Sequence, residues 1–112
     1  MKIDERSVGN VTVLDISGDI TFTQGDAMLK DKIHSLVHQG HNKILVNLAG
    51  VGYIDSAGLG ELVGAYTTVT KSGGSMKLLS LTKKMRDLLS ITKLLTVFDT
   101  YDSEQEAVRK FN

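Results

Sequence analysis

Short apolar runs alternate with longer stretches of helical spacing along this chain of 112 residues. Residues 2–6 and 11–17 carry the apolar and β-branched positions of two strands. Between them, Gly9-Asn10 supplies the residue types of a tight turn. The pattern therefore predicts an opening β-hairpin. Residues 43–48 form a further apolar run, typical of a strand that is buried on both faces of a sheet.

Helices are predicted between and after these runs. Apolar side chains recur at three- and four-residue spacing before Gly40 and again over residues 57–71. These positions are Leu29, Ile33, Leu36 and Val37 in the first helix and Leu59, Leu62, Val63, Tyr66 and Val69 in the second. Candidate capping residues mark helix starts: Thr23 with Asp26 for the first helix, Thr82 for a third helix to Ile91, and Ser103 with Glu106 for a short last helix.

Strands are also expected over residues 76–81 and near Thr96-Val97-Phe98, so the order of elements is ββαβαβαβα. This alternation predicts a single α/β domain over residues 1–112. Its sheet should be mixed and mostly parallel, with right-handed crossovers and the hairpin as an antiparallel edge. Sites in such sheets lie at the carboxyl ends of strands. Three loops meet that description: Gly18 to Thr21, Ala49 to Ser56, and Ser80 to Thr82.

Composition excludes several classes of function. Thirteen basic and 13 acidic side chains balance, which argues against nucleic-acid binding and against a basic membrane-binding patch. There is no cysteine for a disulfide or a thiolate metal site. Met1 to Arg6 is too polar for a signal peptide, and no apolar run approaches the roughly 20 residues of a membrane span. We therefore expect a cytoplasmic protein that needs no cofactor.

One stretch, Tyr53-Ile54-Asp55-Ser56-Ala57-Gly58-Leu59-Gly60, joins the strand over residues 43–48 to the second helix. Ser56 stands at the expected N-cap, where its hydroxyl would accept a hydrogen bond from a helix N–H group. Ser56→Ala would then cost about 0.5–2 kcal/mol of stability. A helix N-terminus also favours negative charge. A phosphate on Ser56 would thus be tolerated, in a site shaped by Asp55 and the N–H groups of Gly58 and Leu59.

Two other kinds of site have weaker support. His34 and His38 are one helical turn apart and could ligate zinc, but they lie off the apolar stripe and fit a solvated flank better. Gly58, Gly60 and Gly64 nearly form a dinucleotide-binding fingerprint. The third glycine comes one position late, and no acidic residue stands at the end of a following strand to hold a ribose. Close packing of the helix on a neighbour is the better explanation for Gly60 and Gly64.

The motif Asp55-Ser56-Ala57-Gly58-Leu59, placed after a buried strand, resembles the phosphorylation site of the STAS-domain family of bacterial anti-sigma factor antagonists. The resemblance extends to the hairpin, to Gly18-Asp19-Ile20 and to Gly74 through Leu81. It implies an interaction protein, not an enzyme, that binds a serine-kinase anti-sigma factor and so releases a sigma factor. The kinase would phosphorylate Ser56 and break the complex, and a serine phosphatase would restore it.

The same resemblance implies where the partner docks. The docking surface should include or border Asp19, Thr21, Ile54, Asp55, Ala57, Gly58, Leu59, Thr82, Lys83 and Met85. The family commonly has an acidic residue at the position of Thr21, and this departure bears on partner contacts and on phosphorylation kinetics. Two alternatives stay open. One is a STAS accessory module of a transport or signalling complex without kinase control, and the other is a small nucleotide-binding protein.

Overall fold

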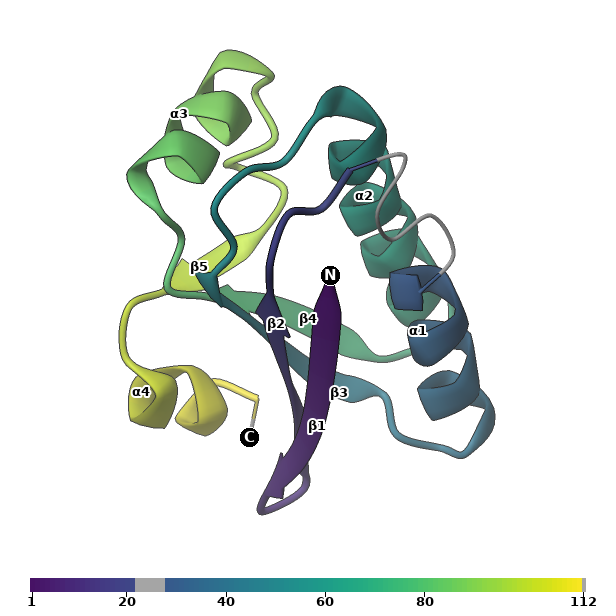
Figure 1. Cartoon of the computed structure of the whole chain (residues 1–112). Helices are drawn as coiled ribbons and strands as arrows, with labels where there is room; N and C mark the ends of the chain where they lie inside the picture. The colour runs from purple at the N-terminus through teal and green to yellow at the C-terminus, as the bar shows by residue number, and fades with distance from the viewer. Residues whose placement is uncertain (22–27, 112) are drawn as a thin grey trace.

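The computed structural model describes residues 1–21 and 28–111, whose strands form one five-stranded sheet in the order β1-β2-β3-β4-β5 (Figure 1). Only β1 and β2 pair antiparallel; the other neighbouring strands are parallel. The predicted fold class and the order ββαβαβαβα are confirmed. In chain order the elements are β1 (Lys2–Val8), β2 (Val11–Ser17), α1 (Met28–His38), β3 (Lys43–Gly50), α2 (Ser56–Lys71), β4 (Ser75–Leu79), α3 (Lys83–Ile91), β5 (Asp99–Tyr101) and α4 (Glu104–Arg109).

Each face of the sheet has its own cover of helices (Figure 1). Side chains of α1, α2 and α3 share one apolar cluster with the sheet, and α4 packs on the opposite face. β2 supplies both clusters, because successive strand residues point to opposite faces: Leu14 lies in the first and Val13 in the second. Burial on both faces explains why β2 and β3 are almost continuously apolar.

The end of α1 and the starts of α3 and α4 follow the predicted capping chemistry. After α1 ends, Gly40 adopts a φ of +88°, the left-handed conformation that glycine accommodates without strain. The hydroxyl of Thr82 accepts from the Met85 N–H at 3.3 Å, and that of Ser103 accepts from the Glu106 N–H at 3.3 Å. Both predicted caps are confirmed. The predicted cap by Thr23 and Asp26 lies outside the described residues.

The last strand differs in position from the prediction. Residues 95–97 form a turn, closed by a hydrogen bond from the Val97 N–H to the Leu94 carbonyl at 3.0 Å, and β5 begins only at Asp99. Phe98 is used for packing instead: its buried ring meets Tyr66 of α2 edge to face at 5.2 Å between centroids. The apolar character of this segment therefore reflects an anchor on α2 and not strand pairing.

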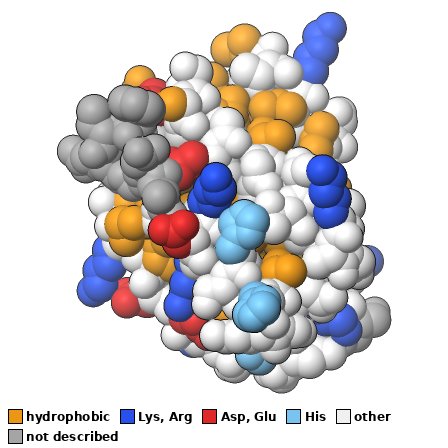
Figure 2. Space-filling model, turned by 90° about the vertical axis from the view of Figure 1, so that its right-hand side faces the viewer, with side chains coloured by type: hydrophobic (Ala, Val, Ile, Leu, Met, Phe, Trp, Pro, Cys, Tyr) orange, Lys and Arg blue, Asp and Glu red, His pale blue; other side chains and the backbone are white. Residues whose placement is uncertain are grey.

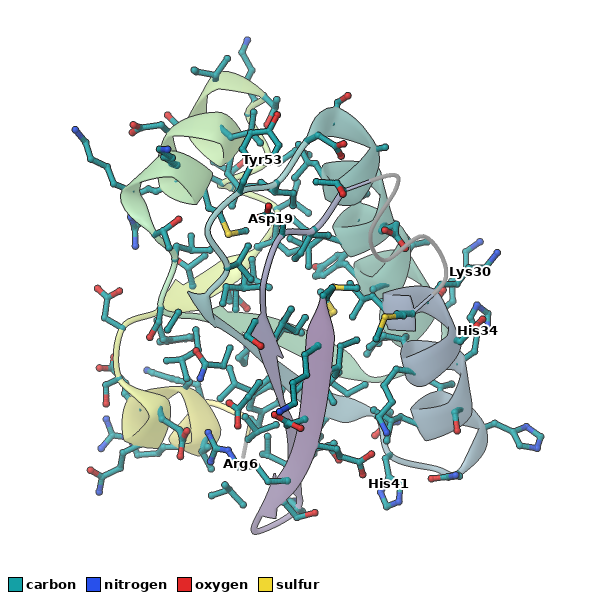
Figure 3. All side chains as sticks on the ribbon, in the orientation of Figure 1. Arg6, Asp19, Lys30, His34, His41 and Tyr53 are labelled. Atoms are coloured by element: carbon teal, nitrogen blue, oxygen red, sulfur yellow. The ribbon has the colours of Figure 1, made fainter. Side chains whose placement is uncertain are left out.

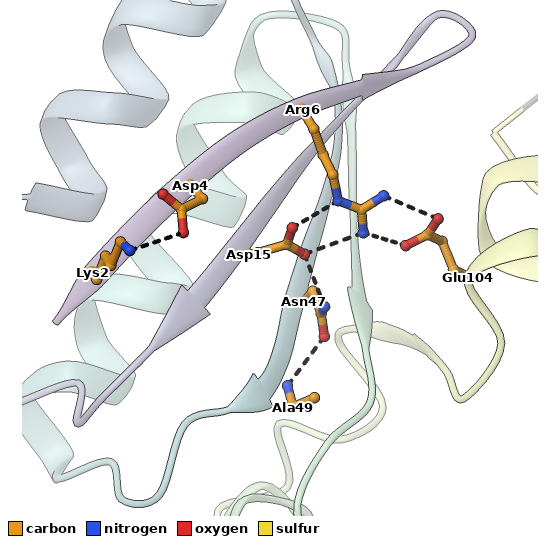
Figure 4. A network of polar contacts seen from close by, with 7 residues as sticks. All are labelled: Lys2, Asp4, Arg6, Asp15, Asn47, Ala49 and Glu104. Atoms are coloured by element: carbon orange, nitrogen blue, oxygen red, sulfur yellow. Dashed lines mark hydrogen bonds and ion pairs between the residues drawn. The ribbon is translucent and has the colours of Figure 1, made fainter.

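A polar network ties the hairpin to the last helix (Figure 4). The guanidinium of Arg6 binds Asp15 of β2 at 2.7 Å and also pairs with Glu104 at the start of α4. Asn47 of β3 donates to Asp15 at 2.9 Å. Contact with Arg6 lowers the pKa of both carboxyl groups below their ordinary values, because it stabilises their charged forms.

Candidate functional site around Ser56

Two loops that are distant in sequence meet at the carboxyl ends of β2 and β3. The Ile20 N–H donates to the Tyr53 carbonyl at 2.9 Å, and the Asp55 N–H donates to the Ile20 carbonyl at 3.3 Å. Ile20 and Ile54 form an isolated parallel bridge, and both side chains are buried. The start of α2 is thereby held against the end of β2, where the parallel sheet predicts a site.

The residue that caps α2 is Asp55 and not Ser56, which corrects the prediction from the sequence. Asp55 has an extended backbone, with φ −96° and ψ 179°, and its carboxylate accepts from the Gly58 N–H at 2.7 Å. The Asp55 carbonyl accepts from the Leu59 N–H at 2.8 Å. The Asp55 carboxylate caps the helix in preference to the Ser56 hydroxyl, because a carboxylate is the stronger hydrogen-bond acceptor and its negative charge is stabilised at a helix N-terminus. The N–H groups of Gly58 and Leu59 are therefore occupied within the protein.

Ser56 is the first residue of α2, and its side chain is exposed. Because Asp55 supplies the cap, the Ser56 hydroxyl neither caps the helix nor is buried. In the part of the chain that is described, the N–H groups of Ser56 and Ala57 donate to no protein acceptor. This leaves an accessible hydroxyl beside helix donors, as a modification site requires.

Gly58 is explained by close approach of the backbone. A Cβ built at this position would lie 2.0 Å from the carbonyl oxygen of Ile20, which no real side chain tolerates. The glycine of the motif thus lets the first turn of α2 rest directly on the loop that follows β2. Its N–H group is already bonded to the Asp55 carboxylate.

A hollow of about 270 Å³ opens beside Ser56, between the β3–α2 loop and α3. Tyr53 lies on this loop in the space between α2 and α3 (Figure 3) and is 52% exposed. The hollow is lined by Tyr53, Ile54, Asp55, Ser56, Lys84 and Leu88. Sequence reasoning did not place Tyr53 or Leu88 at the site, whereas Lys84 lies within the predicted start of the third helix, Thr82 to Met85. The four-residue spacing of Lys84 and Leu88 placed them on one face of α3, but nothing in the sequence showed which face meets the loop.

The other predicted site residues fall into two groups. The side chains of Ile54, Leu59 and Met85 are at most 6% exposed, so they support the surface mainly from below. Ala57 and Lys83 are exposed, and Asp19, Thr21 and Thr82 are half-buried. Asp19 lies on the loop after β2 (Figure 3), where its carboxylate would be 3.5 Å from a Cβ at Gly52.

The face formed by α1 and α2 presents histidine side chains to solvent (Figure 2). His34 and His38 are exposed, as a solvated flank predicts. A hollow of about 390 Å³ between the two helices includes Gly60 and Gly64, and a Cβ at either position would meet no atom of the described residues within 4 Å. The interpretation of these two glycines as close-packing residues is therefore wrong. They leave open space on the surface of α2 and do not pack against a neighbouring helix.

Among residues 1–21 and 28–111, no three potential metal-binding side chains lie close enough together to hold a metal ion. None of the helices formed by these residues is both long enough and apolar enough to cross a membrane.

Comparison with known proteins agrees with this geometry. The STAS domain profile matches residues 2–107. The chain belongs to the STAS domain family. Among curated relatives of this STAS domain, the anti-sigma-B factor antagonist of Bacillus subtilis is 33% identical over 99 residues, which span 88% of this chain and 89% of the relative.

Solved structures show the same fold. The protein TM1081 of Thermotoga maritima superposes with a TM-score of 0.90 at 28% identity, covering 97% of this STAS domain and 93% of the neighbour. The Bacillus cell fate determinant SpoIIAA, solved in its phosphorylated form, superposes with a TM-score of 0.75 at 20% identity, covering 99% of this chain and 100% of that one. At that identity the second likeness concerns the fold alone.

Proposed function

We propose that this protein is a bacterial, cytoplasmic anti-sigma factor antagonist whose binding to a serine-kinase anti-sigma factor is switched off by phosphorylation of Ser56. The observation that carries the proposal is the separation of tasks at the start of α2: Asp55 caps the helix, while Ser56 exposes its hydroxyl on the rim of a hollow. The name of the Bacillus subtilis relative supports the same assignment. The protein acts by binding and not as an enzyme.

The chemistry of the switch belongs to the kinase. The Ser56 hydroxyl oxygen attacks the γ-phosphorus of ATP, the bond to the bridging oxygen of ADP breaks, and the hydroxyl proton passes to a base of the kinase. The product adds a charge of about −1.5 to −2 at neutral pH. Placed at the helix start, that charge is stabilised by about 0.3–1 kcal/mol, so the fold survives modification.

Phosphorylation of Ser56 changes how the partner binds and not how the protein folds. A surface built against a small neutral hydroxyl meets a bulky dianion next to Asp55, and like charge or steric opposition across an interface weakens binding. A serine phosphatase that hydrolyses the phosphoester restores the neutral surface. The reversible signal is thus carried by the surface around Ser56, with no change of fold required.

Three variants test the proposal with the serine-kinase anti-sigma factor of the same genome. Ser56→Ala should bind the kinase like the unmodified protein and accept no phosphate. Ser56→Asp should bind at least about tenfold more weakly, equivalent to about 1.4 kcal/mol. Ser35→Asp is the matched control, because it places the same charge on an exposed serine of α1 and should leave affinity unchanged. Calorimetry measures the affinities, and mass spectrometry after incubation with ATP locates the phosphate.

Two results would overturn this function. If kinase and ATP leave Ser56 unmodified, or if Ser35→Asp weakens binding as much as Ser56→Asp, the switch is not at this site. A STAS module that assembles with a transporter or another signalling complex would then be the better assignment. Saturable binding of ATP or GTP to the isolated protein would favour the nucleotide-binding alternative.

A further inference from the structure

The hollow beside Ser56 brings a lysine from a remote element next to the proposed phosphorylation site. Its walls come from the β3–α2 junction on one side and from Lys84 and Leu88 of α3 on the other. The two walls are separated by about a quarter of the chain in sequence. Any group that is added to the Ser56 hydroxyl and turns into the hollow approaches α3.

Lys84 differs from several cations that are already paired. Lys32, Lys77 and Arg86 each form an ion pair, to Glu5, Asp99 and Asp102 respectively. Within residues 1–21 and 28–111, Lys84 makes no ion pair or hydrogen bond, and its side chain is exposed. The carboxylate in the same hollow, Asp55, is engaged with the Gly58 N–H. Lys84 is therefore the cation in the lining of this hollow that is available to a new anion.

We propose that Lys84 is the counter-cation of the phosphate on Ser56, so that modification joins the start of α2 to α3 across the hollow. This inference rests on the proposed phosphorylation of Ser56. The phosphate both adds charge and occupies the hollow, covering the apolar wall formed by Leu88 beside Tyr53. The modified surface then differs from the unmodified one in shape as well as in charge.

The neighbouring lysine provides a matched control. Lys83 is exposed on the same turn of α3 but does not line the hollow. Substitution of either lysine by glutamine removes one charge from the same helix at an exposed position. Only the change at Lys84 removes a charge from the lining of the hollow that Ser56 also lines. Lys84→Arg keeps the charge and should keep the effect.

The test uses phosphoserine inserted at position 56 during translation, so that it requires no kinase. Phosphorus NMR titration measures the second pKa of the phosphate in the full chain. An ion pair with Lys84 favours the dianion, so the pKa should rise by about 0.2–0.7 units in K84Q and stay near its original value in K83Q and K84R. The shift should shrink in 1 M salt, where charges are screened.

Equal shifts in K84Q and K83Q, or no shift in K84Q, would overturn the inference. Amide NMR spectra of the variants verify that each one is folded. The outcome is independent of the proposed function: a kinase that fails to modify Ser56 defeats the switch, whereas the titration of the inserted phosphoserine still decides whether Lys84 faces it.

Discussion

At the scale of single residues, the start of α2 separates two functions that the motif places side by side. The Asp55 carboxylate accepts from the Gly58 N–H at 2.7 Å and caps the helix. Ser56, one position later, is exposed and serves no cap. A residue that is modified reversibly benefits from this separation, because adding a phosphate then removes no hydrogen bond on which the helix depends.

The two residues should therefore respond differently to alanine. Asp55→Ala should lower the free energy of unfolding by about 0.5–2 kcal/mol, the usual cost of losing an N-cap side chain. Ser56→Ala should change it by less than about 0.5 kcal/mol, as surface substitutions usually do. Urea denaturation of both variants measures this. An equal loss in both would mean that Ser56 shares the cap.

At the scale of elements, glycine serves α2 in two opposite ways. Gly58 lets the first turn approach the Ile20 carbonyl more closely than any side chain would allow. Gly60 lines the hollow beside α1, where an added Cβ would meet no atom of residues 1–21 and 28–111 within 4 Å. The same residue type is thus required at one position of the helix and costs backbone entropy at the other.

Alanine at these two positions should move stability in opposite directions. Gly58→Ala should destabilise the protein by about 1–3 kcal/mol, because the loop after β2 must shift to admit a Cβ. Gly60→Ala should stabilise it by about 0.5–1 kcal/mol, because alanine favours the helical backbone. Thermal and chemical unfolding report both values. A gain of stability in Gly58→Ala would contradict the contact with Ile20.

At the scale of the whole molecule, the Arg6 network joins residues from opposite ends of the chain. Arg6 of β1 bridges Asp15 of β2 and Glu104 of α4, and Asn47 extends the network to β3 (Figure 4). Arg6 and Asp15 are diagonal neighbours in the hairpin register, because Arg6 lies opposite Val13. The side chains are about one-third exposed or more, so the network contributes modestly and not as a buried ion pair would.

This network should make stability depend on pH in the acidic range. The folded-state pKa values of Asp15 and Glu104 lie below the ordinary 3.8 and 4.5, so the unfolded chain binds more protons there. The contribution is complete above about pH 5 and is lost as pH falls through the lower folded-state values. Arg6→Met should cost about 1 kcal/mol at pH 7 and much less at pH 2–3. Urea titrations at both pH values measure the difference.

Lys2→Met is the control for that comparison. Lys2 pairs with Asp4 at 3.7 Å, and both side chains are more than 60% exposed. Its loss should be nearly neutral at either pH. A penalty for Arg6→Met that is the same at pH 7 and at pH 2–3 would show that packing of the arginine stem, and not its charge, stabilises the hairpin.

The sequence by itself determined the elements and their order, because strand and helix periods, turn residues and caps act over a few neighbouring positions. It also identified the Asp55-Ser56 motif and the loops that meet there. Tertiary structure decided which of these two residues caps α2, because that depends on how the loop after β2 holds the Asp55 backbone. It also decided that Phe98 packs on Tyr66, that Gly58 meets Ile20, and that Lys84 and Ser56 line the same hollow. Each of these features brings together segments that are distant along the chain, and the spacing of residues within a short stretch does not predict such long-range contacts.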